Sequence, residues 1–305
     1  MYGGGGSTFN SRGVHDDETK PGPSPHSQGV LAALQVVRYP TLPSLEQFKS
    51  VDVQVGGRLF QQVPLKVRTE LWTNLTNQTL TGRDSAMRYP GLQAQVVSSK
   101  ACGEIQKDIP RTFPDVPGFD DSAGQRRLMR ILRSYCALDP EVGYCQGMNF
   151  VAGLLLRYLP CEANAFAAFC VLMRDRNYRE LFHPSMAHLK ARMAQLEAKL
   201  PAAVASRLRR CQIPPELYAP QWLLSCFGNE FPTTFGARVI DDLLSGRGGR
   251  LAADTLLAVA VEIFVAIDFG GVAEDFESTL RAVREAPRAW GERQLSEVLT
   301  RALGG

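Results

Sequence analysis

The stretch GYCQGMNFVAGLLLRYL, residues 143–159, joins a glycine-flanked turn to a run of helical periodicity. Gly143 and Gly147 permit a tight turn and the close approach of another molecule, because glycine has no side chain to obstruct either. Beyond the turn, apolar residues recur at helical spacing: Met148, Val151, Ala152, Leu155 and Leu159. We therefore predict a loop that is mounted directly on the start of a helix.

The same spacing recurs on both sides of this stretch. Val67, Leu71 and Leu75 follow Val63 at intervals of four, and Pro64 suits a first helical turn. Two further helices are indicated by apolar residues at helical spacing, namely Leu128, Ile131, Leu132 and Tyr135 in one, and Met186, Leu189, Met193, Leu196 and Leu200 in the other. Pro220 can begin a short helix that carries Trp222, Leu223 and Phe227. Residues 233–244 and 251–267 also look helical, and alternating strand patterns are nearly absent. We predict an all-α fold.

Composition narrows the functional class. The chain is 45% hydrophobic and 21% charged, with a net charge of +3, which is typical of a soluble globular protein and gives no indication of nucleic-acid binding. The seven cysteines are scattered without CxxC spacing, so we expect reduced thiols, no metal site and a cytoplasmic location. The apolar segment 251–269 contains Asp254, Glu262 and Asp268, so we expect a buried core helix and no transmembrane segment.

Three regions are expected along the chain. Residues 1–30 are rich in Gly, Ser and Pro and should form a disordered, flexible tail, since they bury too little apolar surface to offset ordering. Residues 31–60 contain isolated apolar residues interrupted by prolines and should form a loosely packed N-terminal extension. Residues 61–303 should form a single multi-helix domain.

Short motifs in this domain resemble a known family. RTELW (68–72), IQKDIPRTFP (105–114) and GYCQGMNF (143–150) resemble the signatures R-x-x-L-W, I-x-x-D-x-x-R-T-F-P and Y-x-Q-G-M-N of the TBC family of Rab GTPase-activating domains. The resemblance continues through VAGLLL (151–156), YAPQWLLSCFGNEFP (218–232) and RVIDDLL (238–244). Two positions depart from it: Ala167 replaces an aromatic residue, and Ile240 replaces a tryptophan before Asp241. The Rab-GAP TBC resemblance thus spans roughly 65 to 270.

Arg111 is expected on a loop. Pro110 should push Ile109 out of the α region, so that the chain leaves any helix just before the arginine, and Pro114 and Pro117 should stiffen the other side. Taken alone, Arg111 would be read as a solvated or structurally paired arginine. The resemblance implies instead an arginine finger, because a guanidinium donates bidentately to γ-phosphate oxygens without losing its charge.

Gln146 lies in the glycine-flanked turn. Its amide can accept a hydrogen bond from water and donate one to phosphate, which is the chemistry that orients an attacking water. The alternative is a buried amide that caps the following helix. The resemblance implies that Gln146 is a glutamine finger. Cys145 is interpreted as packing, since the sequence positions no histidine to activate it.

The resemblance also implies supporting residues. Asp108 is expected to organise the arginine loop, with a helix-end carboxylate as the alternative. Arg68 and Trp72 lie four apart on one helix and are expected to brace the domain or, alternatively, to contact the GTPase. Gln221 and Trp222 are assigned to either packing or recognition. The full set of supporting positions is Ile105, Asp108, Pro110, Thr112, Tyr144, Gly147 and Asn149.

The implied function is acceleration of GTP hydrolysis on GTP-bound Rab proteins, which regulates vesicle trafficking. The chain would act in trans and have no cofactor of its own, because it carries no Walker, dinucleotide or H-E-x-x-H motif; GTP and Mg²⁺ would arrive on the partner. The alternatives are a catalytically silent Rab-binding scaffold and, from another class, a hydrolase that uses Cys145 or a carboxylate pair. Recruitment to endomembranes and peripheral membrane association would occur through partners.

Overall fold

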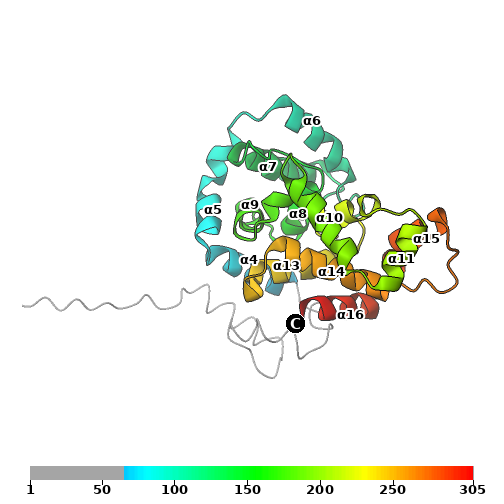
Figure 1. The fold of residues 1–305 in the computed structure, drawn as a ribbon. Helices are drawn as coiled ribbons and strands as arrows, with labels where there is room; N and C mark the ends of the chain where they lie inside the picture. Colours follow the sequence, from blue (N-terminus) through cyan, green and yellow to red (C-terminus); the bar gives the residue numbers. More distant parts are fainter. Residues whose placement is uncertain (1–64, 305) are drawn as a thin grey trace, which may run out of the picture.

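The computed structural model describes residues 65–304, and this part of the chain is helical without a strand (Figure 1). Its first helices are α4 (Leu65–Asn77), α5 (Leu80–Gln93), α6 (Ser99–Asp108), α7 (Ser122–Leu138), α8 (Met148–Tyr158) and α9 (Glu162–Cys170). The later helices are α10 (Ala187–Lys199), α11 (Ala202–Arg210), α12 (Ala219–Leu224), α13 (Thr233–Ser245), α14 (Ala252–Ala266), α15 (Phe276–Ala289) and α16 (Glu292–Leu303). Short elements are the 3-10 helices η1 (Ile109–Arg111), η3 (Tyr178–Phe182), η4 (Pro215–Leu217) and η5 (Arg247–Gly249), and the π-helical turn η2 (Val171–Asp175). The predicted all-α fold is confirmed.

The centre of the fold is α8. Every residue of this helix except Arg157 is buried, because α7, α9 and α13 all pack against it (Figure 1). Helix α5 lies along α9 on one side of the molecule, and α11 and α15 lie at the opposite end. The glycine turn that precedes α8 is therefore mounted on the most enclosed helix, which limits how far its backbone can move.

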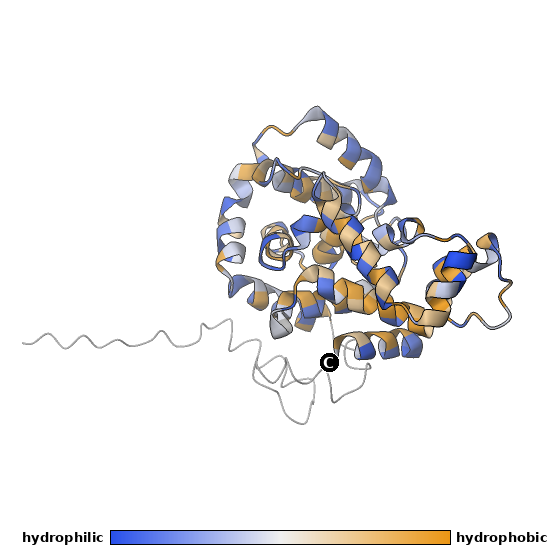
Figure 2. Cartoon of the chain, viewed as in Figure 1, coloured by the Kyte–Doolittle hydropathy of each residue, from blue (hydrophilic) through white to orange (hydrophobic). Residues whose placement is uncertain are grey.

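Helix α14 is the second buried element. Hydrophobic residues predominate along it in Figure 2, and it packs against α10, α12, α13 and α16. It lies inside the protein, as its internal charges predicted. Within residues 65–304, no helix has both the length and the apolar character needed to cross a bilayer.

Most predicted helix positions agree with the structure. Met186 and Leu200 flank α10 as its caps, with Met186 in the left-handed region at φ 55°. The helix after Pro220 was predicted to carry Phe227, which is wrong: α12 ends at Leu224, and Phe227 takes φ 62° in the turn that follows. Phe227 is nevertheless fully buried, so its apolar character reflected packing in the core rather than a helix face.

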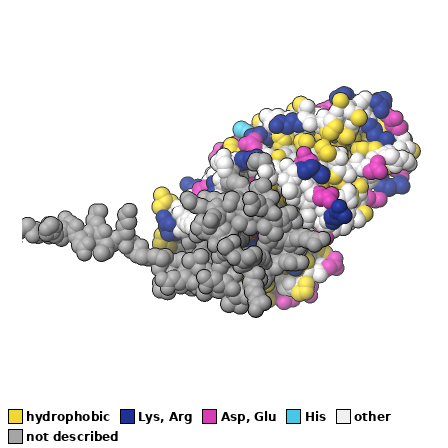
Figure 3. Space-filling view, turned by 90° about the horizontal axis from the view of Figure 1, so that it is seen from below, with side chains coloured by type: hydrophobic (Ala, Val, Ile, Leu, Met, Phe, Trp, Pro, Cys, Tyr) yellow, Lys and Arg dark blue, Asp and Glu magenta, His cyan; other side chains and the backbone are white. Residues whose placement is uncertain are grey.

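The two positions that depart from the expected motifs are both in the core. The side chains of Ala167 and Ile240 are completely buried, so the smaller side chains are enclosed without an opening to solvent. The predictions for residues 1–30, 31–60 and 61–64 lie outside the described residues. On the described part of the face in Figure 3, basic and acidic side chains are interspersed.

Candidate functional site

Arg111 lies at the end of the 3-10 turn η1. Helix α6 ends at Asp108, and Pro110 occupies the first turn of η1. The expected reason was wrong in detail, because Ile109 keeps helical angles of φ −55° and ψ −50°. The α-helix ends instead because Pro110 has no N–H with which to continue the hydrogen bonding. Arg111 is exposed, and its guanidinium forms neither a hydrogen bond nor an ion pair with any described residue.

The backbone just after Arg111 is anchored by Phe113. This residue takes φ 53°, which is costly for a bulky side chain, yet its ring is buried against Phe119 and Phe150 at centroid distances of 5.8 and 5.6 Å. Gly153 makes room for the ring, since a Cβ there would lie 2.9 Å from Phe113 Cε2. Within the described part of the chain, Arg111 therefore has an unbonded side chain on a fixed backbone.

Gln146 is exposed at the tip of the turn before α8. Its carboxamide makes no hydrogen bond within residues 65–304, and the N-cap of α8 is Gly147, without a capping side chain. The amide therefore does not cap the helix, which was the alternative role. Gly147 takes φ 110°, and a Cβ there would lie 2.7 Å from the carbonyl oxygen of Leu224. Only glycine fits this contact between the turn and α12.

Hydrogen bonds join the two loops. The Tyr144 hydroxyl donates to Asp108 Oδ2 at 2.7 Å, and Asn149 Nδ2 donates to Thr112 Oγ1 at 2.8 Å. The Thr112 hydroxyl in turn donates to the carbonyl oxygen of Asp108 at 2.9 Å. Two segments more than thirty residues apart are thus bound side by side. Asp108 lies at the end of α6, and its carboxylate accepts a hydrogen bond from the loop that carries Gln146.

The side chains that link the two loops are largely buried, which stabilises their hydrogen bonds. Burial, together with the Asp108 carboxylate, raises the pKa of Tyr144 well above its ordinary value, so the hydroxyl remains a donor at neutral pH. Asn149 is buried, and its Oδ1 accepts from the Gly147 N–H at 3.0 Å. Ile105 is fully buried on α6 beneath the loop. The pairings leave each of these polar groups satisfied, which favours a single arrangement.

Cys145, beside Gln146, is unsuited to nucleophilic attack. Burial and the neighbouring carboxylates of Glu104 and Asp108 raise the pKa of its thiol. A thiol rather than a thiolate is therefore present near neutral pH, and thiols are poor nucleophiles. These surroundings argue against a hydrolase that uses Cys145.

Arg68 and Trp72 are buried away from solvent. Arg68 Nε and Nη2 donate to the two carboxylate oxygens of Asp241 at 3.1 Å each, and Trp72 Nε1 donates to Asp241 Oδ1 at 2.7 Å. The guanidinium also lies 5.0 Å from the centroid of the Tyr158 ring. Burial would lower the pKa of Arg68, but Asp241 and Tyr158 together raise it above its ordinary value. This group, which we call the α4–α13 brace, fastens the two helices together.

Gln221 and Trp222 occupy different environments on α12. Trp222 is buried, with its ring centroid 5.5 Å from that of Phe264 and 6.0 Å from that of Phe231. Gln221 is exposed, one turn before the Leu224 carbonyl that contacts Gly147. Trp222 is thus placed for packing, and Gln221 is on the surface near the turn that carries Gln146.

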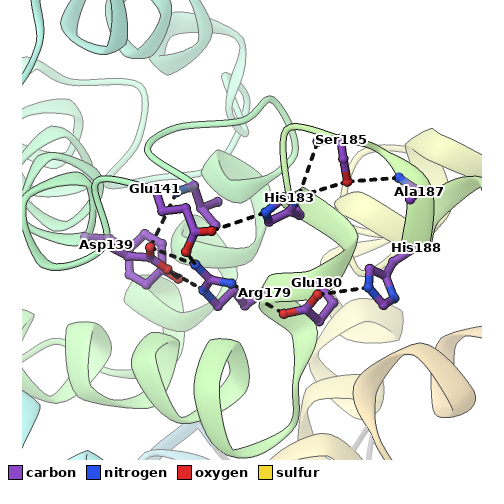
Figure 4. A network of polar contacts seen from close by, with 10 residues as sticks. Asp139, Glu141, Arg179, Glu180, His183, Ser185, Ala187 and His188 are labelled. Carbon is purple, nitrogen blue, oxygen red and sulfur yellow. Dashed lines mark hydrogen bonds and ion pairs between the residues drawn. The ribbon is translucent and has the colours of Figure 1, made fainter.

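Sequence reasoning missed several contributing residues. Asp241 was noted only as part of a motif, although it accepts hydrogen bonds from both brace side chains. Arg179 was not singled out, yet it binds Asp139 and Glu141 at the start of the Gln146 turn (Figure 4). No local pattern pairs residues forty positions apart, so only the fold shows these contacts. Among the described residues, no group of three or more His, Cys, Asp or Glu side chains is arranged to hold a metal ion.

Comparison with known proteins places this geometry in context. The family profile described as the Rab-GTPase-TBC domain matches residues 65–266. The chain is 37% identical over 211 residues to TBC1 domain family member 1 of Homo sapiens, covering 65% of this chain and 18% of that protein. It is 39% identical over 204 residues to the Ecotropic viral integration site 5 protein homolog of Homo sapiens, covering 65% of this chain and 24% of that protein. It is 34% identical over 187 residues to the Rab GTPase-activating protein eat-17 of Caenorhabditis elegans, covering 60% of this chain and 20% of that protein.

Solved structures share the fold. The crystal structure of the Ypt/Rab-GAP domain of Gyp1p superposes with a TM-score of 0.69 at 16% identity, covering 92% of this chain and 98% of that one. A Chlamydomonas flagellar RabGAP TBC domain gives 0.67 at 19% identity, with 92% of each chain covered. The chain therefore spans nearly all of these isolated domains but no more than about a quarter of the three curated relatives named above.

Proposed function

Because the chain belongs to the Rab-GTPase-TBC domain family, we propose that it accelerates GTP hydrolysis on Rab-family GTPases by supplying Arg111 and Gln146 in trans. The observation that carries the proposal is the pair of hydrogen bonds, Tyr144 to Asp108 and Asn149 to Thr112, that binds the two loops together. These bonds hold two exposed side chains without partners among residues 65–304 on adjacent, fixed segments.

Arg111 acts on the charge of the transition state. As the γ-phosphoryl group is transferred to water, charge spreads over its equatorial oxygens, and the guanidinium donates to them bidentately. An arginine supplied in trans contributes roughly 10³ to 10⁵ in rate, or about 4 to 7 kcal/mol of barrier. A guanidinium with no partner among the described residues is available for this contact, since no ion pair seen there must first be broken.

Gln146 acts on the attacking water. The carbonyl oxygen of its side chain accepts a hydrogen bond from the water, and its amide donates toward the phosphate, which aligns the water for in-line attack. GTP and Mg²⁺ are brought by the GTPase. The similarity to a Rab GTPase-activating protein supports a GTP-bound Rab as the partner. In the cell, the chain acts in the cytoplasm on Rab proteins at endomembranes and thereby regulates vesicle trafficking, with any membrane association made through partners.

Single-turnover GTP hydrolysis on a panel of GTP-loaded Rab proteins tests the proposal. The wild-type chain should accelerate at least one Rab, and Arg111→Ala and Gln146→Ala should each remove most of that acceleration. Neither side chain is bonded within residues 65–304, so both variants should unfold at the wild-type denaturant midpoint. Binding to a Rab without acceleration of any member would instead support the scaffold function.

A further inference from the structure

Arg179 lies outside the recognised motifs, and Figure 4 shows its guanidinium against the carboxylates of Asp139 and Glu141. It projects from η3, where Nε donates to Asp139 Oδ2 at 2.8 Å and Nη2 donates to Asp139 Oδ1 at 3.2 Å. Nη2 also donates to Glu141 Oε2 at 2.5 Å. One guanidinium thus spans two carboxylates on the segment that leads from α7 to Gln146.

Asp139 shapes the start of that segment. It is the C-cap of α7, its Oδ1 accepts from the Val142 N–H at 3.4 Å, and its carbonyl oxygen accepts from the Gly143 N–H at 2.9 Å. The Tyr135 hydroxyl also donates to its carboxylate at 3.0 Å. Asp139 therefore fixes the backbone through Gly143, three residues before Gln146, and Arg179 fixes Asp139.

Element η3 is also bonded to α12, the helix that contacts the other end of the turn. Tyr178 precedes Arg179 in the chain and is buried. Its hydroxyl donates to the carbonyl oxygen of Leu223 at 2.6 Å. The following carbonyl, that of Leu224, is the group that contacts Gly147. The 3-10 helix η3 thus connects to the residues before Gln146 through Arg179 and to the residue after it through α12.

We propose that Arg179 is a positioning residue for Gln146: by holding Asp139 and Glu141, it sets the backbone from which the glutamine reaches the attacking water. This inference rests on the proposed function. The turn has three supports: Arg179 at its start, the Tyr144–Asp108 bond in its middle, and the Asn149 and Leu224 contacts at its end. The loop that carries Arg111 shares the Tyr144–Asp108 bond and the Asn149 contact with this turn, but Arg179 does not contact that loop.

The charges around Arg179 favour this role. Its neighbours are the carboxylates of Asp139, Glu141 and Glu180, and beyond them His183 contacts Glu141 and His188 contacts Glu180. Burial alone would raise the pKa of Asp139, but hydrogen bonds from Arg179 and Tyr135 hold it below its ordinary value. The ionised Asp139 and the bidentate fork require arginine, because a lysine ammonium cannot span both carboxylates in the same geometry.

The test is a mutant cycle in the full chain, on the Rab that the wild type accelerates most. Arg179→Lys should lower the maximal single-turnover rate by about tenfold, since a misplacement of about 1 Å can cost roughly 10²-fold. The chain concentration that gives half-maximal rate should change little. In a Gln146→Ala background the same substitution should cause no further loss, whereas in an Arg111→Ala background it should cause its full loss.

Two further variants isolate the effect. Asp139→Asn keeps the shape of the side chain but removes the charge that Arg179 binds, and should give the same pattern across the cycle. Arg130→Lys is the matched control. Arg130 binds both oxygens of Glu162 on α9 at 2.9 and 2.5 Å, and this substitution should leave the maximal rate unchanged. Denaturant unfolding of every variant reports stability separately.

The outcomes separate this inference from the function on which it rests. A wild-type chain that accelerates no Rab would overturn both. If the wild type is active, two results would overturn the positioning role alone. One is a wild-type rate of Rab GTP hydrolysis with Arg179→Lys. The other is an undiminished loss of rate when Arg179→Lys is added to Gln146→Ala. The positioning role would be supported if Arg179→Lys caused no loss of rate in the Gln146→Ala background and its full loss in the Arg111→Ala background.

Discussion

Two arginines in recognised motifs occupy opposite environments in this fold. Arg68 is 3% exposed and binds both oxygens of Asp241, whereas Arg111 is exposed and has no bonded partner within residues 65–304. The helix that carries Arg68 lies against α13, and the 3-10 turn that carries Arg111 ends in a loop. The same residue type thus joins two helices in one place and is left exposed to solvent in the other.

Substitution of Arg68 and substitution of Arg111 should affect different properties of the protein. A buried, paired arginine contributes to folding, because its removal leaves the partner carboxylate enclosed without a counter-charge. An exposed arginine on a fixed backbone contributes little to folding and keeps its donors for a ligand. The free energy of unfolding and the rate of GTP hydrolysis should therefore respond to different members of the pair.

Removal of the buried arginine should have the largest effect on folding. Arg68→Ala should lower the free energy of unfolding by about 3–5 kcal/mol, because Asp241 would keep the Trp72 indole donor but lose both guanidinium bonds. Arg111→Ala should change it by no more than about 0.5 kcal/mol. Denaturant unfolding of the two variants measures the difference.

A surface ion pair supplies the control for this prediction. Arg293, with a 94% exposed side chain, pairs with Glu297 one helical turn away at 3.0 Å, and Arg293→Ala should cost less than about 1 kcal/mol. Equal unfolding free energies for Arg68→Ala and Arg293→Ala would contradict the importance assigned to the α4–α13 brace.

A smaller effect is expected where the two loops meet. Tyr144→Phe removes the hydroxyl that donates to Asp108, and should lower the free energy of unfolding by about 1 kcal/mol. It should also reduce the acceleration of GTP hydrolysis on the Rab, by less than Arg111→Ala does, because Arg111 and Gln146 lose one of their shared supports. Single-turnover hydrolysis and denaturant unfolding together measure both changes.

Tyr89→Phe is the matched substitution. The Tyr89 hydroxyl donates to Glu162 Oε2 at 2.9 Å, away from both loops, so its loss should affect unfolding alone. If Tyr89→Phe slowed hydrolysis as much as Tyr144→Phe, the link between the loops would have no special part in catalysis.

The elements with large apolar residues at regular spacing were predictable from sequence. Helices α7, α8, α10 and α14 follow such patterns closely. Helix α5 was not predicted, because its buried face includes the small residues Gly82 and Ser85 and its interior contains Pro90. Small residues bury little apolar area, so a close helix contact leaves almost no periodic signal.

The geometry of the candidate site was predictable where it depends on local motifs and unpredictable where it depends on long-range pairing. The exposed residues Arg111 and Gln146 were named from their motifs, and the position of each on a turn follows from the neighbouring proline and glycines. That Tyr144 would meet Asp108, or that Arg179 would meet Asp139, depends on how helices pack. A single sequence carries no direct record of such contacts.

Preferential binding to the transition state tests the account's central claim most directly. The measurement is the affinity of the full chain for a GDP-bound Rab with Mg²⁺, with and without aluminium fluoride as a mimic of the transferring phosphoryl group. The wild type should bind at least about 100-fold more tightly with the mimic, as expected for a transition-state analogue. Arg111→Ala should lose that gain. Equal affinities with and without the mimic, or an unchanged gain in Arg111→Ala, would contradict the claim.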